Sequence, residues 1–164
     1  IQMKIYHIIP FIVILLLYSN CGGSESSKSN TNPKEQLVNI LAIQNTFFCA
    51  DENNADTLIA NRKTAGEWER FTMVYLNSNT IVLKSFKNKY VTVDHGRSNY
   101  LIANSESMEQ AEQFVLMNQD NGYVAFKSST GEYLCSDQIL EGKLVANRQA
   151  IGDWEKFRIV EINK

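Results

Sequence analysis

Apolar and polar side chains alternate over short stretches of this chain from about residue 38 onward. Phe71 stands two positions before Met73, and Phe157 stands two positions before Ile159, each time with a polar residue between them. Alternation with a period of two is typical of β-strands that bury one face. Polar turns separate the apolar runs and predict four strands in the first copy of the pattern, near residues 38–43, 46–50, 57–60 and 70–76.

The whole pattern occurs three times at a spacing of 43 residues. The positions that match without a gap include Val38, Ile81 and Val124; Asp51, Asp94 and Asp137; Leu58, Leu101 and Leu144; and Phe71, Phe114 and Phe157. Three ungapped copies at one spacing are hard to obtain by chance and indicate an internal repeat. We therefore expect twelve strands and almost no helix.

Three four-stranded units close most simply as a β-trefoil, a six-stranded barrel capped by three hairpins. A propeller closes with about four to eight blades, so three blades would leave open edges. The barrel of a trefoil has no free edge that could aggregate. The predicted fold is all-β: a β-trefoil of three 43-residue repeats, with pseudo-threefold symmetry and a core of matched Val, Leu and Phe residues.

One motif within the repeat carries a family resemblance. Residues 58–71 read Leu-x-Ala-Asn-Arg, then Gly and Trp-Glu-x-Phe, which resembles the fascin-like β-trefoils of the actin-crosslinking superfamily over about residues 38–162. The resemblance implies a binding module for carbohydrate or for protein. The repeat-motif residues are Asn61, Arg62, Trp68, Glu69 and Phe71 in the first copy, Asn104, Glu112 and Phe114 in the second, and Asn147, Arg148, Trp154, Glu155 and Phe157 in the third.

The first 20 residues differ from everything that follows. Met3-Lys4 is a short basic start, and the apolar run from Ile8 to Tyr18 is too short for a bilayer span of roughly 20 residues. The run ends in Ser19-Asn20-Cys21, which resembles a bacterial lipoprotein signal with Cys21 as the lipidated residue. The alternatives are an ordinary signal peptide, or a short helix, with an incidental cysteine.

The N-terminal pattern predicts three parts and a location. Residues 1–20 are expected to be the lipoprotein signal peptide, residues 21–36 the lipidated cysteine with a flexible tether, and residues 37–164 the fascin-like trefoil. The tether contains no large apolar residue, so it cannot offset the entropy of ordering. We expect a bacterial envelope protein, anchored to a membrane by lipid only, at the periplasmic face or the cell surface.

Composition, charge and motifs limit the possible classes of function. The formal net charge is −2, so no basic surplus points to nucleic acid. Beyond residue 20, His95 is the only histidine, and no metal-ligand, nucleophile or phosphate-loop motif is visible. We expect a monomeric, non-catalytic module without cofactor or metal, although a long-range pair of carboxylates would escape detection in a sequence.

Trp68 and Trp154 are expected to pack internally, because each stands three residues before a core phenylalanine. The alternative is that an exposed indole stacks on a sugar. Arg62 and Arg148 are expected to pack over these indoles as cation–π pairs; the alternative is that they face a ligand.

Recurrence in all three repeats favours a structural role for the Asn, Asp and Glu positions, with the Asn amides bonding nearby backbone at turns. For the three symmetric carboxylates the alternative is coordination of a cation. Cys49 and Cys135 share one repeat position, where Thr92 is the third member. Symmetric positions approach within the about 7 Å that a disulfide needs only near the threefold axis. We therefore expect two buried free thiols, with a disulfide as the alternative.

The candidate ligand site lies where repeat 2 departs from the other two repeats. Its residues are Phe86, Lys87 and Lys89 in the first turn and His95, Arg97 and Tyr100 in the next loop. An exposed aromatic ring beside cations and amides can stack on a sugar and bond its hydroxyls. We expect carbohydrate as the partner, with an envelope protein as the alternative. If these residues bind no ligand, they belong to ordinary solvated loops.

Overall fold

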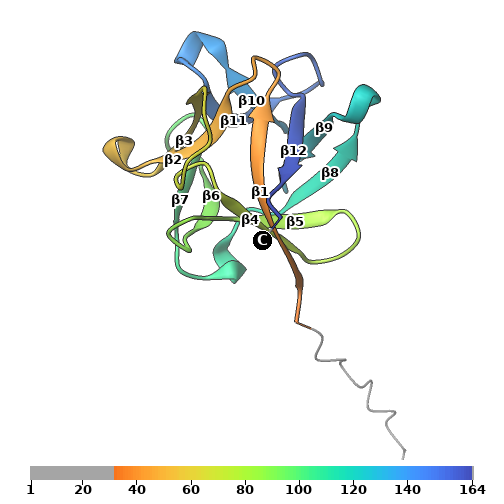
Figure 1. Ribbon diagram of the computed structural model, residues 1–164. Helices are drawn as coiled ribbons and strands as arrows, with labels where there is room; N and C mark the ends of the chain where they lie inside the picture. The colour runs from red at the N-terminus through yellow and green to blue at the C-terminus, as the bar shows by residue number, and fades with distance from the viewer. Residues whose placement is uncertain (1–31, 164) are drawn as a thin grey trace, which may run out of the picture. The chain divides into compact units, whose positions relative to one another are not determined.

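Twelve strands make up the domain in the computed structural model, which describes residues 32–163 (Figure 1). They are β1 (Lys34–Ala42), β2 (Phe47–Asp51), β3 (Thr57–Arg62), β4 (Phe71–Tyr75), β5 (Thr80–Ser85), β6 (Tyr90–Asp94), β7 (Tyr100–Ser105), β8 (Phe114–Asn118), β9 (Val124–Lys127), β10 (Tyr133–Asp137), β11 (Lys143–Arg148) and β12 (Phe157–Glu161). The described residues also contain four short 3₁₀ turns: η1 (Glu52–Asn54), η2 (Met108–Gln110), η3 (Asp120–Gly122) and η4 (Gln138–Leu140). The expected four strands per repeat are confirmed.

Strand β1 begins earlier than the sequence indicated. Residues 34–36, expected to belong to the tether, pair with β4, in a register that sets Lys34 opposite Tyr75 and Gln36 opposite Met73. These residues contain no large apolar side chain, so periodicity could not reveal a strand that backbone pairing with β4 creates.

Six strands close into a barrel. The ring of antiparallel pairs runs β1, β4, β5, β8, β9, β12 and back to β1. The register repeats the symmetry of the sequence, because the first-strand residue of each repeat lies opposite its fourth-strand phenylalanine: Val38 opposite Phe71, Ile81 opposite Phe114, and Val124 opposite Phe157. Near its C-terminal end the described chain meets β1, with the Ile162 N–H bonded to the Leu37 carbonyl.

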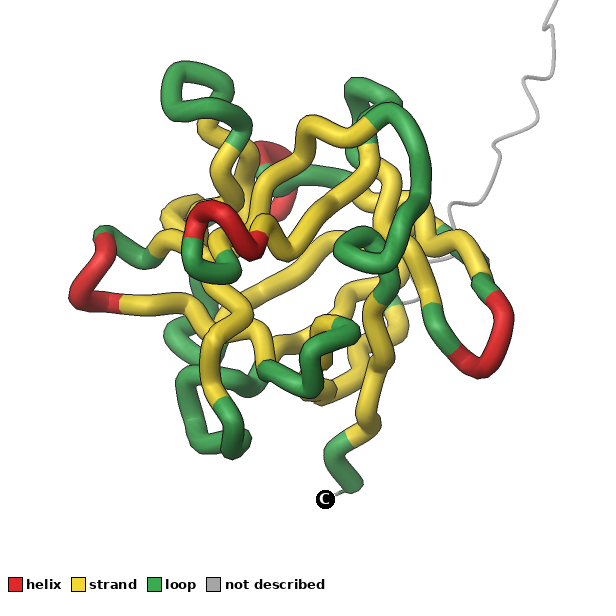
Figure 2. Tube along the Cα trace, turned by 90° about the horizontal axis from the view of Figure 1, so that it is seen from above, coloured by secondary structure: helices red, strands yellow, loops and turns green. Residues whose placement is uncertain are grey.

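The remaining strands form three hairpins, β2–β3, β6–β7 and β10–β11, which pair with one another and cap the barrel (Figures 1 and 2). One alanine N–H in each hairpin donates to a turn carbonyl of a neighbouring hairpin: Ala60 to Gly142 (2.7 Å), Ala103 to Asp56 (2.9 Å) and Ala146 to Asn99 (3.0 Å). A six-stranded barrel closed by three mutually paired hairpins is a β-trefoil, as predicted.

Phenylalanine dominates the core. Phe48 and Phe126 both pack edge-on against Phe157, with ring centroids 5.1 and 5.7 Å away, and Phe114 packs against Phe126 at 6.0 Å. The matched Val, Leu and Phe positions are buried around these rings.

The tryptophans are not part of this core, so the expectation of internal packing is wrong. Trp68 and Trp154 are only half-buried, whereas the next residue in each case, Glu69 or Glu155, is 5% exposed. Each Trp-Glu pair occupies the middle of a turn, closed by the Arg70 N–H on the Glu67 carbonyl (3.1 Å) or the Lys156 N–H on the Asp153 carbonyl (3.2 Å), and in both turns the glutamate takes the inner side.

Residues 1–31 lie outside the described part of the chain, so the expected signal peptide, the lipidated Cys21 and most of the expected tether do too. None of the helical turns within residues 32–163 has the length and apolar character needed to cross a bilayer.

Candidate functional site

The Arg, Asp and Glu that recur at matching positions of repeats 1 and 3 form two similar ion-pair clusters. Arg148 Nη2 lies 2.8 Å from Asp137 Oδ2, and its Nε lies 3.7 Å from Glu155 Oε1. Glu155 Oε2 also accepts a bond from the Gly152 N–H (2.7 Å). This arrangement satisfies a nearly buried carboxylate from both sides, which is a structural task.

Repeat 1 holds the same cluster in a looser form. Arg62 lies 3.7 Å from Asp51 and 3.9 Å from Glu69, and the Gly66 N–H bonds Glu69 at 2.7 Å. Both arginines are therefore directed at carboxylates, and the expected stacking over tryptophan is not among the cation–π contacts of the described residues. The Asp and Glu positions of repeats 1 and 3, for which a structural role is expected, thus bind arginine and backbone N–H groups of their own repeat.

The three asparagines do not hold turns, contrary to expectation. Asn61, Asn104 and Asn147 lie inside strands β3, β7 and β11. The Asn104 amide oxygen accepts from the Thr92 hydroxyl (2.9 Å), and the Asn147 oxygen accepts from Arg148 (2.5 Å). The turn-capping role belongs to the aspartates instead, since Asp51, Asp94 and Asp137 each accept a backbone N–H two residues ahead.

Cys49 and Cys135 are free and fully buried, as expected. Each thiol lies beside one of the ion-pair clusters. Burial, together with Glu69 for Cys49 and Glu155 for Cys135, raises the pKa of each thiol to about 12. A thiolate is therefore disfavoured at both positions, and neither cysteine suits nucleophilic chemistry.

These raised pKa values predict that the domain loses stability in alkali. An unfolded thiol releases its proton near pH 9 while the folded thiol keeps it to about pH 12, so the unfolded state binds fewer protons in that window. The contribution is fully present below pH 9 and falls by about 1.4 kcal/mol per pH unit per thiol above it.

Urea unfolding at pH 8 and pH 10 measures this loss. The control is a Cys49→Thr, Cys135→Thr variant, because Thr92 occupies the same position in repeat 2. Tyrosine and lysine titration is common to both proteins, so only the extra loss in the wild type reports the thiols. Equal losses in the two proteins would contradict the raised pKa values.

The six residues predicted to bind ligand lie at two separate places. Phe86, Lys87 and Lys89 occupy the β5–β6 turn. His95 and Arg97 occupy the β6–β7 turn at the far end of β6, and Tyr100 begins β7 there. Strand β6 has five residues, so the two turns are separated by about 13 Å along the strand. They do not form one site.

Several of these residues already have partners. Lys87 Nζ lies 2.6 Å from Glu52, Lys89 pairs with Glu106, and Lys143 lies over the Tyr100 ring at 5.5 Å. His95 Nδ1 lies 2.9 Å from the Asn99 amide oxygen. The pairs of Lys87 and Lys89 are at the surface, where such pairs contribute little energy.

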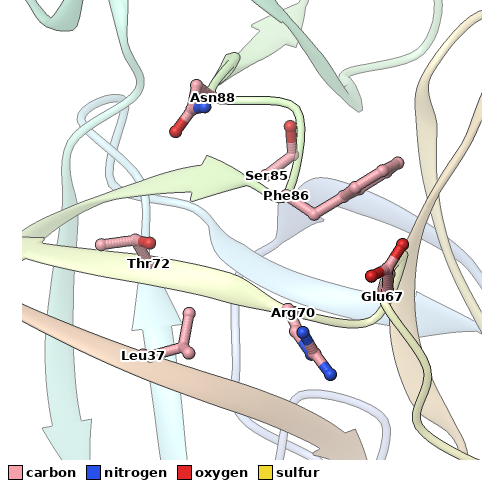
Figure 3. Close-up of a pocket in the computed structure, with 7 residues that line it drawn as sticks. All are labelled: Leu37, Glu67, Arg70, Thr72, Ser85, Phe86 and Asn88. Carbon is pink, nitrogen blue, oxygen red and sulfur yellow. The ribbon is translucent and has the colours of Figure 1, made fainter. Parts of the chain in front are cut away.

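Phe86 stands at the edge of a groove, which we call the Phe86 groove (Figure 3). Its volume is about 410 Å³, which is within the range of small-molecule sites. Its lining comes from β1, the β3–β4 loop, β4, the end of β5 and the β5–β6 turn: Leu37, Glu67, Arg70, Thr72, Ser85, Phe86 and Asn88. Figure 3 shows the Phe86 side chain extending from the β5–β6 turn, with Glu67 and Arg70 below it in the view.

The ring of Phe86 is held in place by Trp68. The two ring planes lie within 21° of parallel, with centroids 6.4 Å apart. This stack joins the β3–β4 loop of repeat 1 to the β5–β6 turn of repeat 2. In the next repeat both partners are small, Ala111 and Ser129, and the Ser129 N–H instead bonds Glu112 (2.7 Å).

The groove has mixed chemistry. Phe86 and Leu37 supply apolar surface, Glu67 and Arg70 supply opposite charges, and Asn88 supplies an exposed amide. Arg70 makes no ion pair with any residue in the described range. An apolar ring beside free donors and acceptors can bind a polar ring-shaped ligand.

Sequence reasoning missed Glu67 and Arg70. One signal could have found Arg70: the residue before the core phenylalanine is basic in repeats 1 and 3, Arg70 and Lys156, and uncharged in repeat 2, Gln113. No group of three or more His, Cys, Asp and Glu side chains that could hold a metal occurs within residues 32–163.

The family described as a domain of unknown function, DUF7910, matches residues 36–139, which is more than half of the chain. The chain belongs to the DUF7910 family. The match includes the whole Phe86 groove and ends at Ile139, within repeat 3. No curated protein sequence matches this DUF7910 protein.

Solved structures place the DUF7910 domain among the β-trefoils. The designed threefold-symmetric protein ThreeFoil superposes with a TM-score of 0.66 at 16% identity, over 77% of this chain and 99% of that one. SeviL, solved with the asialo-GM1 saccharide, gives 0.63 at 12% identity, over 79% and 100%. The lectin of Polyporus squamosus, solved with Neu5Acα2-6Galβ1-4GlcNAc, gives 0.64 at 13% identity, over 80% of this chain and 50% of that one.

Proposed function

We propose that this DUF7910 domain is a non-catalytic carbohydrate-binding module and that the Phe86 groove holds the sugar. The observation that carries the proposal is the Phe86 ring, held by Trp68 at 6.4 Å and lining an open groove beside Arg70 and Glu67. A pyranose face can stack on such a ring while its hydroxyls bond charged and amide groups. Two similar trefoils are solved with saccharides, which supports the same class of ligand.

The positions of the buried carboxylates also agree with a binding role. Glu69, Asp137 and Glu155 are 5–6% exposed and bond arginine or backbone N–H groups. They stabilise the repeat and do not line the Phe86 groove. The predicted lipid anchor at Cys21 would hold the module at the surface of an envelope membrane, and the closer resemblance to fascin-like trefoils stays a prediction.

A Phe86→Leu variant tests this function. Leucine keeps an apolar contact with Trp68 but removes the flat aromatic face, so at least one glycan should bind about three- to tenfold more weakly. Residues 32–163 contain the complete closed barrel and its core, so a soluble fragment of residues 32–164 can be used. A glycan array selects ligands, and titration calorimetry with the asialo-GM1 saccharide and Neu5Acα2-6Galβ1-4GlcNAc measures affinity.

Ile139→Ala is the control, because Ile139 is 82% exposed and does not line the groove. It should bind every glycan as the wild type does. Unchanged binding by Phe86→Leu would contradict the assignment to this groove. A folded wild-type domain that binds no glycan would contradict the carbohydrate function itself.

The alternative partner is an envelope protein. One observation favours it: Ile139, in the η4 turn, is an isoleucine with 82% of its surface exposed. If no glycan binds, the turn that carries Ile139 is the place to seek such a contact.

A further inference from the structure

A second hollow lies where repeat 3 meets repeat 1, and we call it the Tyr123 groove. Ile43, Tyr123, Ile151 and Lys156 line it together with the η3 turn. Its volume is about 490 Å³, compared with about 410 Å³ for the Phe86 groove. The function proposed above does not involve the Tyr123 groove.

The two grooves occupy equivalent places in the pseudo-threefold repeat. Three lining residues correspond by the repeat spacing: Tyr123 stands 86 residues after Leu37, Lys156 stands 86 residues after Arg70, and Phe86 stands 43 residues after Ile43. Each groove therefore lies where the loop after the third strand of one repeat meets the turn after the first strand of the next.

Both grooves carry the same kinds of side chain in a different arrangement. Each has one aromatic residue, one aliphatic residue and one cation at the three equivalent positions, but the aromatic and aliphatic residues have exchanged walls. The third junction has Thr80, Gln113 and Ser129 there, with neither a ring nor a charge. Two of the three junctions between repeats therefore carry a ring and a charge at these positions. The third carries neither, and we call it the plain junction.

The walls of the Tyr123 groove are held by local contacts. The Arg158 guanidinium lies over one face of the Tyr123 ring, 4.4 Å from its centroid. Lys156 Nζ lies 3.1 Å from Asp153. The η3 turn is closed by a bond from the Gln119 N–H to the Tyr123 carbonyl (2.8 Å), so the aromatic wall is ordered before any ligand arrives.

We propose that the Tyr123 groove is a second carbohydrate subsite, chemically different from the Phe86 groove. The free face and hydroxyl of Tyr123 supply the platform, and Lys156 with the Asp120 and Asn121 side chains of η3 supplies polar partners. Because the ring stands on the opposite wall, the two subsites accept a sugar in different orientations and differ in glycan preference. This proposal rests on the carbohydrate function proposed above, and it makes one chain bivalent.

Matched variants of residues 32–164 test the second subsite. Tyr123→Leu removes its ring, Phe86→Leu removes the ring of the first groove, and Thr80→Ala changes the plain junction. After array screening, titration calorimetry uses the asialo-GM1 saccharide and Neu5Acα2-6Galβ1-4GlcNAc. We expect Phe86→Leu and Tyr123→Leu each to weaken a different part of the wild-type binding about three- to tenfold, and the double variant to weaken both parts. Thr80→Ala should bind as the wild type.

Lys156→Ala provides an independent test if Tyr123→Leu does not fold, since the Lys156 side chain is 33% exposed and lies outside the hydrophobic core. It should weaken the binding that Phe86→Leu retains by at least threefold. If Phe86→Leu weakens every part of the binding while Tyr123→Leu and Lys156→Ala bind as the wild type, the second subsite is overturned and the proposed function stands. If the folded wild type binds no glycan, both are overturned.

Discussion

Replacing Phe157 with alanine should lower the free energy of unfolding by about 3–5 kcal/mol. The Phe157 ring is fully buried and meets Phe48 of repeat 1 at 5.1 Å and Phe126 of its own repeat at 5.7 Å. Its removal would leave a cavity at the place where the two repeats join, and the closed barrel can relax only partly into it. Urea unfolding of residues 32–164, extrapolated to water, measures the loss.

Two further variants make this result specific to the core. Val160→Ala alters the same strand at a side chain that is 46% exposed, and it should change stability by less than about 0.5 kcal/mol. Phe157→Leu keeps much of the volume and should cost roughly 1–2 kcal/mol. A loss below 1 kcal/mol for Phe157→Ala would mean that the aromatic cluster is not the centre of packing.

Gly142→Ala should be nearly as damaging, with a loss of about 2–4 kcal/mol. Gly142 has φ +85°, and a Cβ there would stand 2.7 Å from the backbone oxygen of Ala60. The Gly142 carbonyl accepts the Ala60 N–H at 2.7 Å, one of the three bonds that join the cap hairpins. A methyl group would force these hairpins apart. Thermal and urea unfolding measure the effect.

The Gly122→Ala variant distinguishes the steric clash expected at Gly142 from the cost of a positive φ. Gly122 also has a positive φ, +75°, but a Cβ there meets no heavy atom within 4 Å. Its substitution should therefore cost only the left-handed backbone penalty, about 1 kcal/mol. Equal losses for the two glycine variants would contradict the close approach of the hairpins.

Much of the scaffold was predictable because its signals are local and are repeated. Alternation with a period of two selects the buried face of each strand, and three copies at one spacing require an architecture that closes with three units. The buried phenylalanines and the free cysteines followed from these matched positions. The start of β1 was missed because backbone pairing with β4, and not an apolar pattern, extends it to Lys34.

The direction of the tryptophans and arginines needed the tertiary structure. Trp68 and Glu69 are neighbours in the sequence, and either could have pointed inward. The Gly66 N–H and Arg62 hold the carboxylate inside, which leaves the indole to stack on Phe86 from the following repeat. Contacts between repeats are not visible in the pattern within one repeat.

The sequence by itself thus determined the all-β class, the threefold barrel and the residues of its core. The reason is that the alternation of apolar and polar residues, which selects the buried side chains, is a pattern of neighbouring positions in the chain. Only the tertiary structure decided where a ligand could bind. The Phe86 groove combines Leu37, Arg70 and Phe86 from separate segments, and the Tyr123 groove combines Ile43 with Lys156 from opposite ends of the domain. Their shapes depend on how the barrel closes, and that closure is a property of the whole chain.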